Sequence, residues 1–146
     1  MKNEGMTIIV KTITRIILWM VFLYGAYIIL HGHLTPGGGF AGGVIIALGF
    51  LSILIAYGKT FTMKWLNLKF LEEFEASSIL LFIIMGIGGI LFSGVFLINL
   101  ISPGNLFHLL SAGQIPLLNV FIGIKVGASL FLVVYALSQL KLEEGE

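Results

Sequence analysis

The sequence contains no cysteine, and charged residues make up only 10% of its 146 residues. The absence of cysteine excludes disulfides, thiolate metal sites and dithiol redox chemistry. Soluble domains carry about 25% charged residues. A soluble domain is excluded here by the scarcity of charge, by the 58% of hydrophobic residues and by a mean hydropathy of +1.10. A net charge of +1 offers no basic surface for nucleic acid. These properties predict a single all-α membrane domain, multi-pass in the cell membrane.

Four apolar runs are long enough to cross a hydrocarbon layer of about 30 Å. They cover residues 13–30, 36–57, 77–101 and 116–140. The first run continues to a histidine-glycine turn without a small-residue cleavage site, which favours a retained span over a signal peptide. The basic residues outside the spans all precede the first span, separate the second from the third, or follow the fourth. The positive-inside rule therefore predicts that both termini are cytoplasmic.

Short interfacial helices are expected in two of the connecting segments. In residues 61–75, Leu66, Phe70 and Phe74 share one helical face, which predicts a helix in the headgroup region. A solvated linker with aromatic anchors is the alternative for this segment. In the outer loop of residues 102–115, apolar residues predict a turn of helix on the membrane; they are Leu106, Phe107, Leu109 and Leu110.

The stretch H-G-H-L-T-P-G-G-G-F-A-G-G, residues 31–43, lies between the first two spans and has no charged residue. Thr35 followed by Pro36 predicts a helix N-cap and a first-turn proline. Gly37, Gly38 and Gly39 would then form a first turn that unwinds easily, because glycine is a weak helix former. The alternative is a tight turn between two spans.

His31 and His33 lie at the outer edge of the first span. Two imidazoles are too few for a structural zinc site, and no metal is expected. Histidines exposed to water or bonded to carbonyl groups are the default expectation, with a protonatable relay as the functional alternative. Glu75, at the mouth of the third span, is the acidic residue best placed to attract a cation; a carboxylate favoured by the helix dipole is the alternative.

Lys125 lies inside the fourth span, where a charged lysine costs about 2.5–3.5 kcal/mol on insertion scales. It belongs either to a proton or cation path or to a structural ion pair or carbonyl contact. Because no acidic residue falls within a predicted span, a carboxylate partner is expected from another chain. Gly123 and Gly127 are each two residues away, so the glycines can contact one neighbouring helix while Lys125 faces another.

Small residues recur at helical spacing in three spans, a pattern that lets helix backbones approach closely in lipid. At least one of these stripes is expected to face a partner protein, and packing within the chain is the alternative. The stripes are Gly39, Gly43 and Ala47; Gly86, Gly89 and Ser93; and Gly123 with Gly127. No nucleophile elbow, phosphate loop or H-E-x-x-H motif is present, so neither catalysis nor a cofactor is expected.

Two stretches resemble a known family. Residues 31–43 and the stretch from Gly113-Gln-Ile-Pro-Leu-Leu-Asn119 to Lys125-Val126 resemble the MnhB-type subunit of the multisubunit Mrp/Mnh-type sodium/proton antiporters and its homologue in archaeal membrane-bound hydrogenase complexes. The resemblance implies a small non-catalytic subunit that packs beside other small and large membrane subunits and helps couple sodium to proton movement. The positions that the resemblance implies as functional are Pro36, Gly37, Gly38, Gly39, Phe40, Asn119 and Lys125.

Two features qualify the resemblance. Ala41 stands where the family often has a polar residue, which weakens any ion-binding role at that position. The absence of cysteine and aspartate and the scarcity of glutamine suit a thermophile and favour the hydrogenase version.

The competing interpretation is a structural spacer with no residue on the ion path. An autonomous four-helix channel is a third, opposed by the lack of acidic residues in the predicted spans.

Overall fold

The computed structural model describes residues 5–101, 104–105, 108 and 111–143, which form helices and turns. The helices are α1 (Ile8–Leu30), α2 (Gly39–Tyr57), α3 (Lys59–Trp65), α4 (Leu68–Ser93) and α5 (Ile115–Glu143). Four of them, α1, α2, α4 and α5, are long and apolar enough to cross a membrane. The prediction of an all-α, four-span protein is therefore confirmed.

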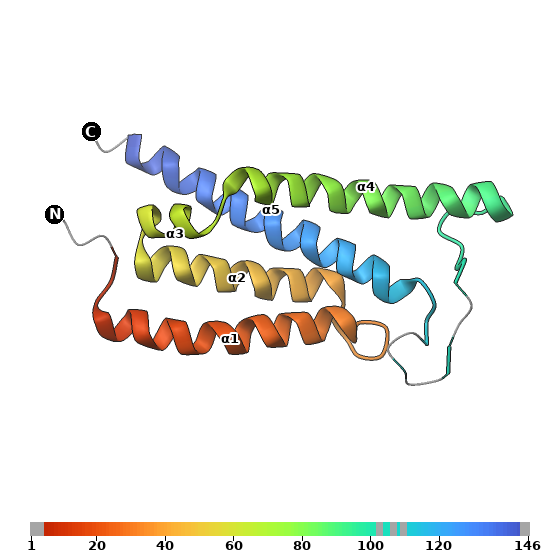
Figure 1. The fold of residues 1–146 in the computed structure, drawn as a ribbon, viewed down its shortest axis with the longest axis horizontal. Helices are drawn as coiled ribbons and strands as arrows, with labels where there is room; N and C mark the ends of the chain where they lie inside the picture. Colours follow the sequence, from red (N-terminus) through yellow and green to blue (C-terminus); the bar gives the residue numbers. More distant parts are fainter. Residues whose placement is uncertain (1–4, 102–103, 106–107, 109–110, 144–146) are drawn as a thin grey trace.

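The four long helices run side by side, with α2 between α1 and α5, and with α4 packed on α5 (Figure 1). The start of α1 and the end of α5 lie at the same end of the bundle, next to α3 (Figure 1). At the opposite end α4 extends beyond its neighbours (Figure 1). An even number of membrane crossings brings the two ends of the chain to the same side of the membrane. That this side is the cytoplasmic one stays a prediction.

The start of α4 differs most from the sequence prediction. The third span was expected at residues 77–101, whereas α4 runs over Leu68–Ser93. Asn67 caps its first turn by accepting a hydrogen bond from the Lys69 N–H at 3.1 Å, and Gly94 ends it in the left-handed conformation with φ 73°. A short helix, α3, does lie in the segment predicted to hold one, but it ends at Trp65. The chain breaks at Asn67, so Leu66 does not share a helical face with Phe70 and Phe74, which belong to α4.

The turn that precedes α2 also differs from the prediction. Thr35 and Pro36 do not open the helix, which begins at Gly39 with Gly38 as its N-cap. Gly37 and Gly38 adopt positive φ angles of 140° and 87°, a region that excludes them from a helical turn. Thr35 instead closes the end of α1, where its hydroxyl and its N–H both donate to the His31 carbonyl at 3.1 and 2.9 Å.

Glycines bring the backbones of α2 and α5 together. A Cβ atom on Gly43 would lie 2.7 Å from the Gly123 carbonyl oxygen and 2.9 Å from Val126 Cβ, and one on Gly127 would lie 3.3 Å from the Gly43 carbonyl. Cβ atoms essentially never lie within 3.0 Å of such atoms, so glycine is the residue that fits at position 43 without a shift of α5. The two glycine stripes of α2 and α5 therefore pack against each other.

The third small-residue stripe is also covered by this chain. Phe96 lies against Gly86, and a Cβ on Gly89 would meet the Val95 carbonyl at 2.7 Å and the Leu97 N–H nitrogen at 3.1 Å. The chain after α4 thus folds back onto the helix. The chain's own segments cover the glycines of all three stripes, whereas Ser93 is exposed. A partner-facing role for one of the stripes stays a prediction. The predicted helical turn around residues 106–110 lies outside the described residues, apart from His108.

Replacing Gly43 by alanine should lower the thermal unfolding midpoint in detergent. The added methyl group would overlap the α5 backbone, and overpacking of this kind costs about 1–3 kcal/mol. Gly88→Ala is the matched control, because a Cβ there meets only Leu100 Cδ1 at 3.7 Å and alanine raises helix propensity. Equal unfolding midpoints for the two variants would contradict the close α2–α5 contact.

Candidate functional site

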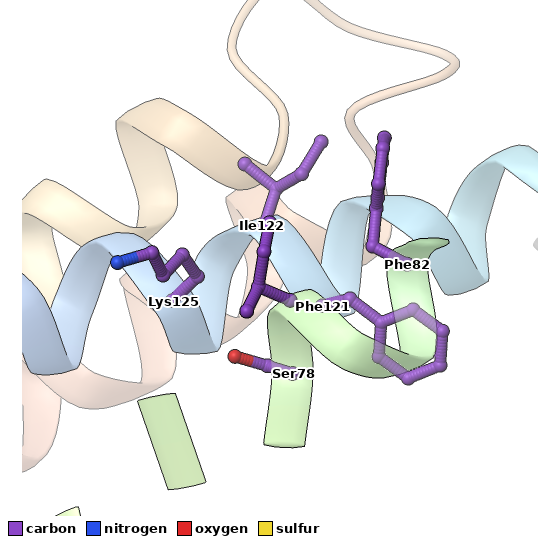
Figure 2. A pocket seen from close by; sticks show the side chains of 6 residues that line it. Ser78, Phe82, Phe121, Ile122 and Lys125 are labelled. Carbon is purple, nitrogen blue, oxygen red and sulfur yellow. The ribbon is translucent and has the colours of Figure 1, made fainter. Parts of the chain in front are cut away.

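A small cavity of about 100 Å³ lies between α4 and α5, beside Lys125 (Figure 2). Ser78 and Phe82 of α4 face Phe121 and Ile122 of α5 across it. The Lys125 ammonium points away from the two phenyl rings (Figure 2). Apolar walls on one side thus direct the charged group of Lys125 toward the start of α4.

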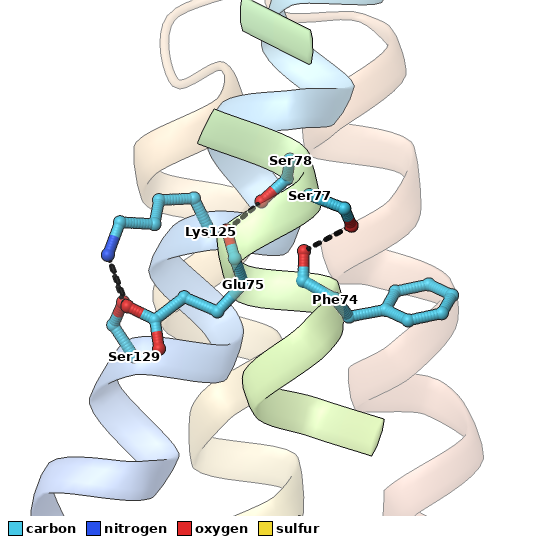
Figure 3. Close-up of polar contacts among 6 residues, drawn as sticks. All are labelled: Phe74, Glu75, Ser77, Ser78, Lys125 and Ser129. Atoms are coloured by element: carbon cyan, nitrogen blue, oxygen red, sulfur yellow. Dashed lines mark hydrogen bonds and ion pairs between the residues drawn. The ribbon is translucent and has the colours of Figure 1, made fainter. Parts of the chain in front are cut away.

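At that point Lys125 forms an ion pair with Glu75 of α4 (Figure 3). The Ser129 hydroxyl joins the two, since it lies 2.8 Å from Lys125 Nζ and donates to Glu75 Oε1 at 2.5 Å. Ser129 follows Lys125 by one helical turn, so both side chains emerge from the same face of α5. The site is therefore a three-membered cluster of ammonium, carboxylate and hydroxyl that joins two membrane helices.

The cluster overturns the expected source of the Lys125 counterion. A carboxylate from another chain was expected because the third span was predicted to begin after Glu75. In the structure α4 begins at Leu68, which places Glu75 roughly 10 Å into the helix at 1.5 Å per residue. Lys125 lies roughly 15 Å from the start of α5 by the same measure. The counterion is supplied by this chain, and a span does contain an acidic residue.

The cluster is not sealed by the helices that form it. In the isolated chain the side chains of Lys125 and Glu75 are 36% and 25% exposed. A carboxylate and a hydroxyl are oxygen ligands of the kind that hard cations prefer, and the ammonium already lies at both of them. The arrangement can accept another cation or proton only if Lys125 moves away or loses its charge.

The two histidines that follow the C-terminal end of α1 contact backbone carbonyls. His31 stacks on Tyr27 at 4.2 Å between ring centroids, and its Nδ1 lies 3.1 Å from the Tyr27 carbonyl oxygen. His33 Nε2 lies 3.3 Å from the His108 carbonyl oxygen. The structure therefore does not bring these rings into the Lys125 cluster. Both histidines contact backbone carbonyl groups, as the default expectation had it.

Asn119 lies against the glycine-rich turn. A Cβ on Gly38 would meet its Oδ1 at 3.4 Å, and one on Gly32 would meet its Nδ2 at 2.8 Å. Phe40, on the first turn of α2, is 66% exposed, and Pro36 is exposed as well. The residues implied by the resemblance thus form two groups, one at the glycine-rich turn and one at Lys125, about six residues apart along α5.

Gln114 is a structural residue that the sequence did not single out. Its side chain is 1% exposed, donates to the Leu97 and Ile98 carbonyls at 3.3 and 2.7 Å, and accepts from the Leu100 N–H at 3.3 Å. Its own N–H donates to Asn99 Oδ1 at 2.9 Å. These bonds fasten the segment after α4 to the start of α5. Contacts between such separated segments leave no periodic signal in the sequence.

Four membrane-spanning helices and a charged cluster between two of them define a multi-pass membrane protein. A family profile described as "Domain related to MnhB subunit of Na+/H+ antiporter" matches residues 9–132. Since the match covers most of the chain, this protein belongs to the MnhB family. The family resemblance predicted from residues 31–43 and 113–126 is confirmed.

Individual relatives agree with the family. The B-type Na(+)/H(+) antiporter subunit of Bacillus subtilis (strain 168) is 32% identical over 97 residues, which cover 65% of this chain and 67% of the relative. An uncharacterized protein of Methanocaldococcus jannaschii is 38% identical over 120 residues, covering 78% of this chain and 45% of the relative.

A solved structure also matches. A chain of the membrane-bound sulfane sulfur reductase, an archaeal respiratory membrane complex, superposes with a TM-score of 0.75 at 34% identity. The match covers 91% of this chain and 60% of that chain. This protein therefore spans about half of the archaeal relative and three fifths of the chain in the respiratory complex.

Replacing Glu75 by alanine should lower the free energy of unfolding by about 2–3 kcal/mol, because it leaves a charged lysine in the membrane without its carboxylate. Glu73→Ala, which removes an exposed carboxylate of the same helix, should change it by less than about 0.5 kcal/mol. The double variant Glu75→Leu with Lys125→Met should regain most of the loss, because neither charge is left unpaired. Equal losses for Glu75→Ala and Glu73→Ala would contradict the pairing.

Replacing Gln114 by leucine should speed amide hydrogen exchange in residues 97–100. The substitution removes the side-chain partner of the Leu100 N–H and of the Leu97 and Ile98 carbonyls, which are part-buried, at a cost of about 1 kcal/mol for each hydrogen bond. Asn105→Ala removes an exposed amide from the same loop and should leave the exchange unchanged. Hydrogen-exchange mass spectrometry of both variants measures the difference, and unaltered protection in Gln114→Leu would exclude the fastening role.

Proposed function

We propose that this protein is a non-catalytic membrane subunit of a multisubunit sodium/proton antiporter module. In this proposal the cluster of Lys125, Glu75 and Ser129 takes part in coupling sodium movement to proton movement. The observation that carries it is the ion pair between two membrane helices. Ionisable residues inside membrane spans are costly and mark ion pathways by default. Membership of the MnhB family supports the same assignment.

The proposed partners are the other small and large membrane subunits of such a module. The likeness to a chain of the sulfane sulfur reductase complex supports placement in an archaeal respiratory membrane complex. Composition alone favours a hydrogenase, but the structural likeness supports the broader class, in which the redox enzyme can differ. The exposed Phe40 and Pro36, next to the turn that Asn119 contacts, are proposed to face one of these subunits.

The second candidate is that the ion pair only clamps α4 to α5, so that the chain is a structural spacer. The same hydrogen bonds support this function, because a partly exposed charge pair with a shared hydroxyl links α4 to α5 at one level. The candidates differ in whether the position of each charge matters. A clamp works equally well with its two charges exchanged, whereas a coupling site depends on which helix carries the ammonium.

Exchanging the charges in the assembled complex separates the candidates. We expect Lys125→Ala to reduce sodium uptake driven by a proton gradient roughly tenfold, within the range of coupling energies between sites. The double variant Lys125→Glu with Glu75→Lys should restore assembly but not transport. Uptake of radiolabelled sodium by membrane vesicles measures transport, and native gel electrophoresis measures assembly.

Lys69→Gln is the matched control for these variants, because it removes an exposed lysine near the start of α4 without touching the cluster. It should leave both assembly and sodium uptake at the level of the unmodified complex. Restoration of both by the exchanged pair would establish the clamp and refute the coupling role. Normal sodium uptake by an assembled Lys125→Ala complex would refute it as well.

A further inference from the structure

A second and larger cavity lies away from the Lys125 cluster, between α1, α2 and α3. It has a volume of about 730 Å³, within the range of ligand-binding pockets. Aromatic side chains and one cation line most of it: Arg15, Trp19, Phe22, Tyr57, Phe61 and Trp65. The groove is thus an apolar channel with a positive charge at its edge, near the end of the bundle where α1 begins.

The walls of the groove are ordered by ring contacts. Phe22 packs on Phe50 with centroids 5.0 Å apart, and Tyr57 stacks on Phe61 at 4.6 Å. Ile53, which is 3% exposed, closes the base. Trp19 and Trp65 are 68% and 58% exposed and border the opening. Stacked rings that line a groove without filling it leave a preformed apolar space.

Positive charge collects at one edge of this groove. Arg15 lines it directly, and Lys11 lies one helical turn earlier on the same face of α1, with its ammonium 5.9 Å from the centroid of the Tyr57 ring. Among the residues that the structure describes, the recorded ion pair is that of Lys125 with Glu75, and neither Lys11 nor Arg15 has an acidic partner. The edge can therefore receive an anion.

We infer that this groove binds one anionic phospholipid. The acyl chain lies along the aromatic wall, and the headgroup phosphate contacts Arg15 and Lys11. The charge and the geometry favour this occupant over others. A free phosphate would gain nothing from the apolar wall, and a zwitterionic lipid brings its own ammonium to a positive edge. Tryptophans such as Trp19 and Trp65 are typical of the membrane interface, where headgroup and acyl chain meet.

Tryptophan fluorescence tests the inference directly, because the chain has two tryptophans and both border the groove. The full-length chain is reconstituted in phosphatidylcholine vesicles that contain brominated phosphatidylglycerol or brominated phosphatidylcholine, whose bromines quench nearby indoles. We expect phosphatidylglycerol to reach half-maximal quenching at a mole fraction at least fivefold lower, since one basic residue near an anionic lipid contributes about fivefold in affinity.

The variants assign this preference to the groove edge. Arg15→Gln should reduce the preference about fivefold, Arg15→Lys should largely keep it, and Lys69→Gln should keep it fully because that exposed lysine lies outside the groove. Added inorganic phosphate should not compete. Native mass spectrometry of the detergent-extracted complex should retain an anionic lipid that is lost in Arg15→Gln.

Several results would overturn the inference. Equal quenching by the two lipids in the unmodified chain would show that the groove does not select charge. A preference that survives Arg15→Gln would place the site elsewhere. Competition by inorganic phosphate would indicate a free-anion site, and tryptophans that neither lipid quenches would indicate a protein segment or second copy in the groove. The headgroup comparison in the unmodified chain decides the question even if a variant fails to fold.

Discussion

Hydrocarbon cannot solvate an ammonium group, and this constraint determines how α4 and α5 are joined. Lys125 is accommodated because Glu75 and Ser129 lie within hydrogen-bonding reach on the facing surfaces of the two helices. The opposite face of α5 carries glycines that admit the backbone of α2. α5 therefore holds the bundle together through two different interactions, close backbone contact on one side and a charge pair on the other.

The two faces explain why the apolar spans pack in one particular arrangement. Apolar surface alone gives little preference between helix neighbours in lipid, because the acyl chains are equally apolar. Glycine contacts fix the height of α2 against α5, and the charge pair fixes the height of α4. The end of α4 is then joined to α5 by hydrogen bonds, with Gln114 linking the segment after α4 to the start of α5.

Hydropathy and the spacing of residues on α5 were sufficient to predict the four spans and to place Lys125 on a face separate from Gly123 and Gly127. The ion pair could not be predicted, because α4 begins with amphipathic turns whose charged residues lower the local hydropathy. Glu72, Glu73 and Glu75 lie in those turns, so a hydropathy profile starts the span after them. The bonds of Gln114 and the cationic groove depend on tertiary contacts, for which a single sequence has no periodic signal.

The charge pair is partly exposed on the surface of the isolated chain. About a third of the Lys125 side chain and a quarter of that of Glu75 stay uncovered by the isolated chain. Lipid offers no hydrogen bond to these groups, so a polar surface or water must complete their environment in the membrane. In the proposed multisubunit complex, this exposed part of the pair is where water or a polar surface of a neighbouring subunit would complete the site.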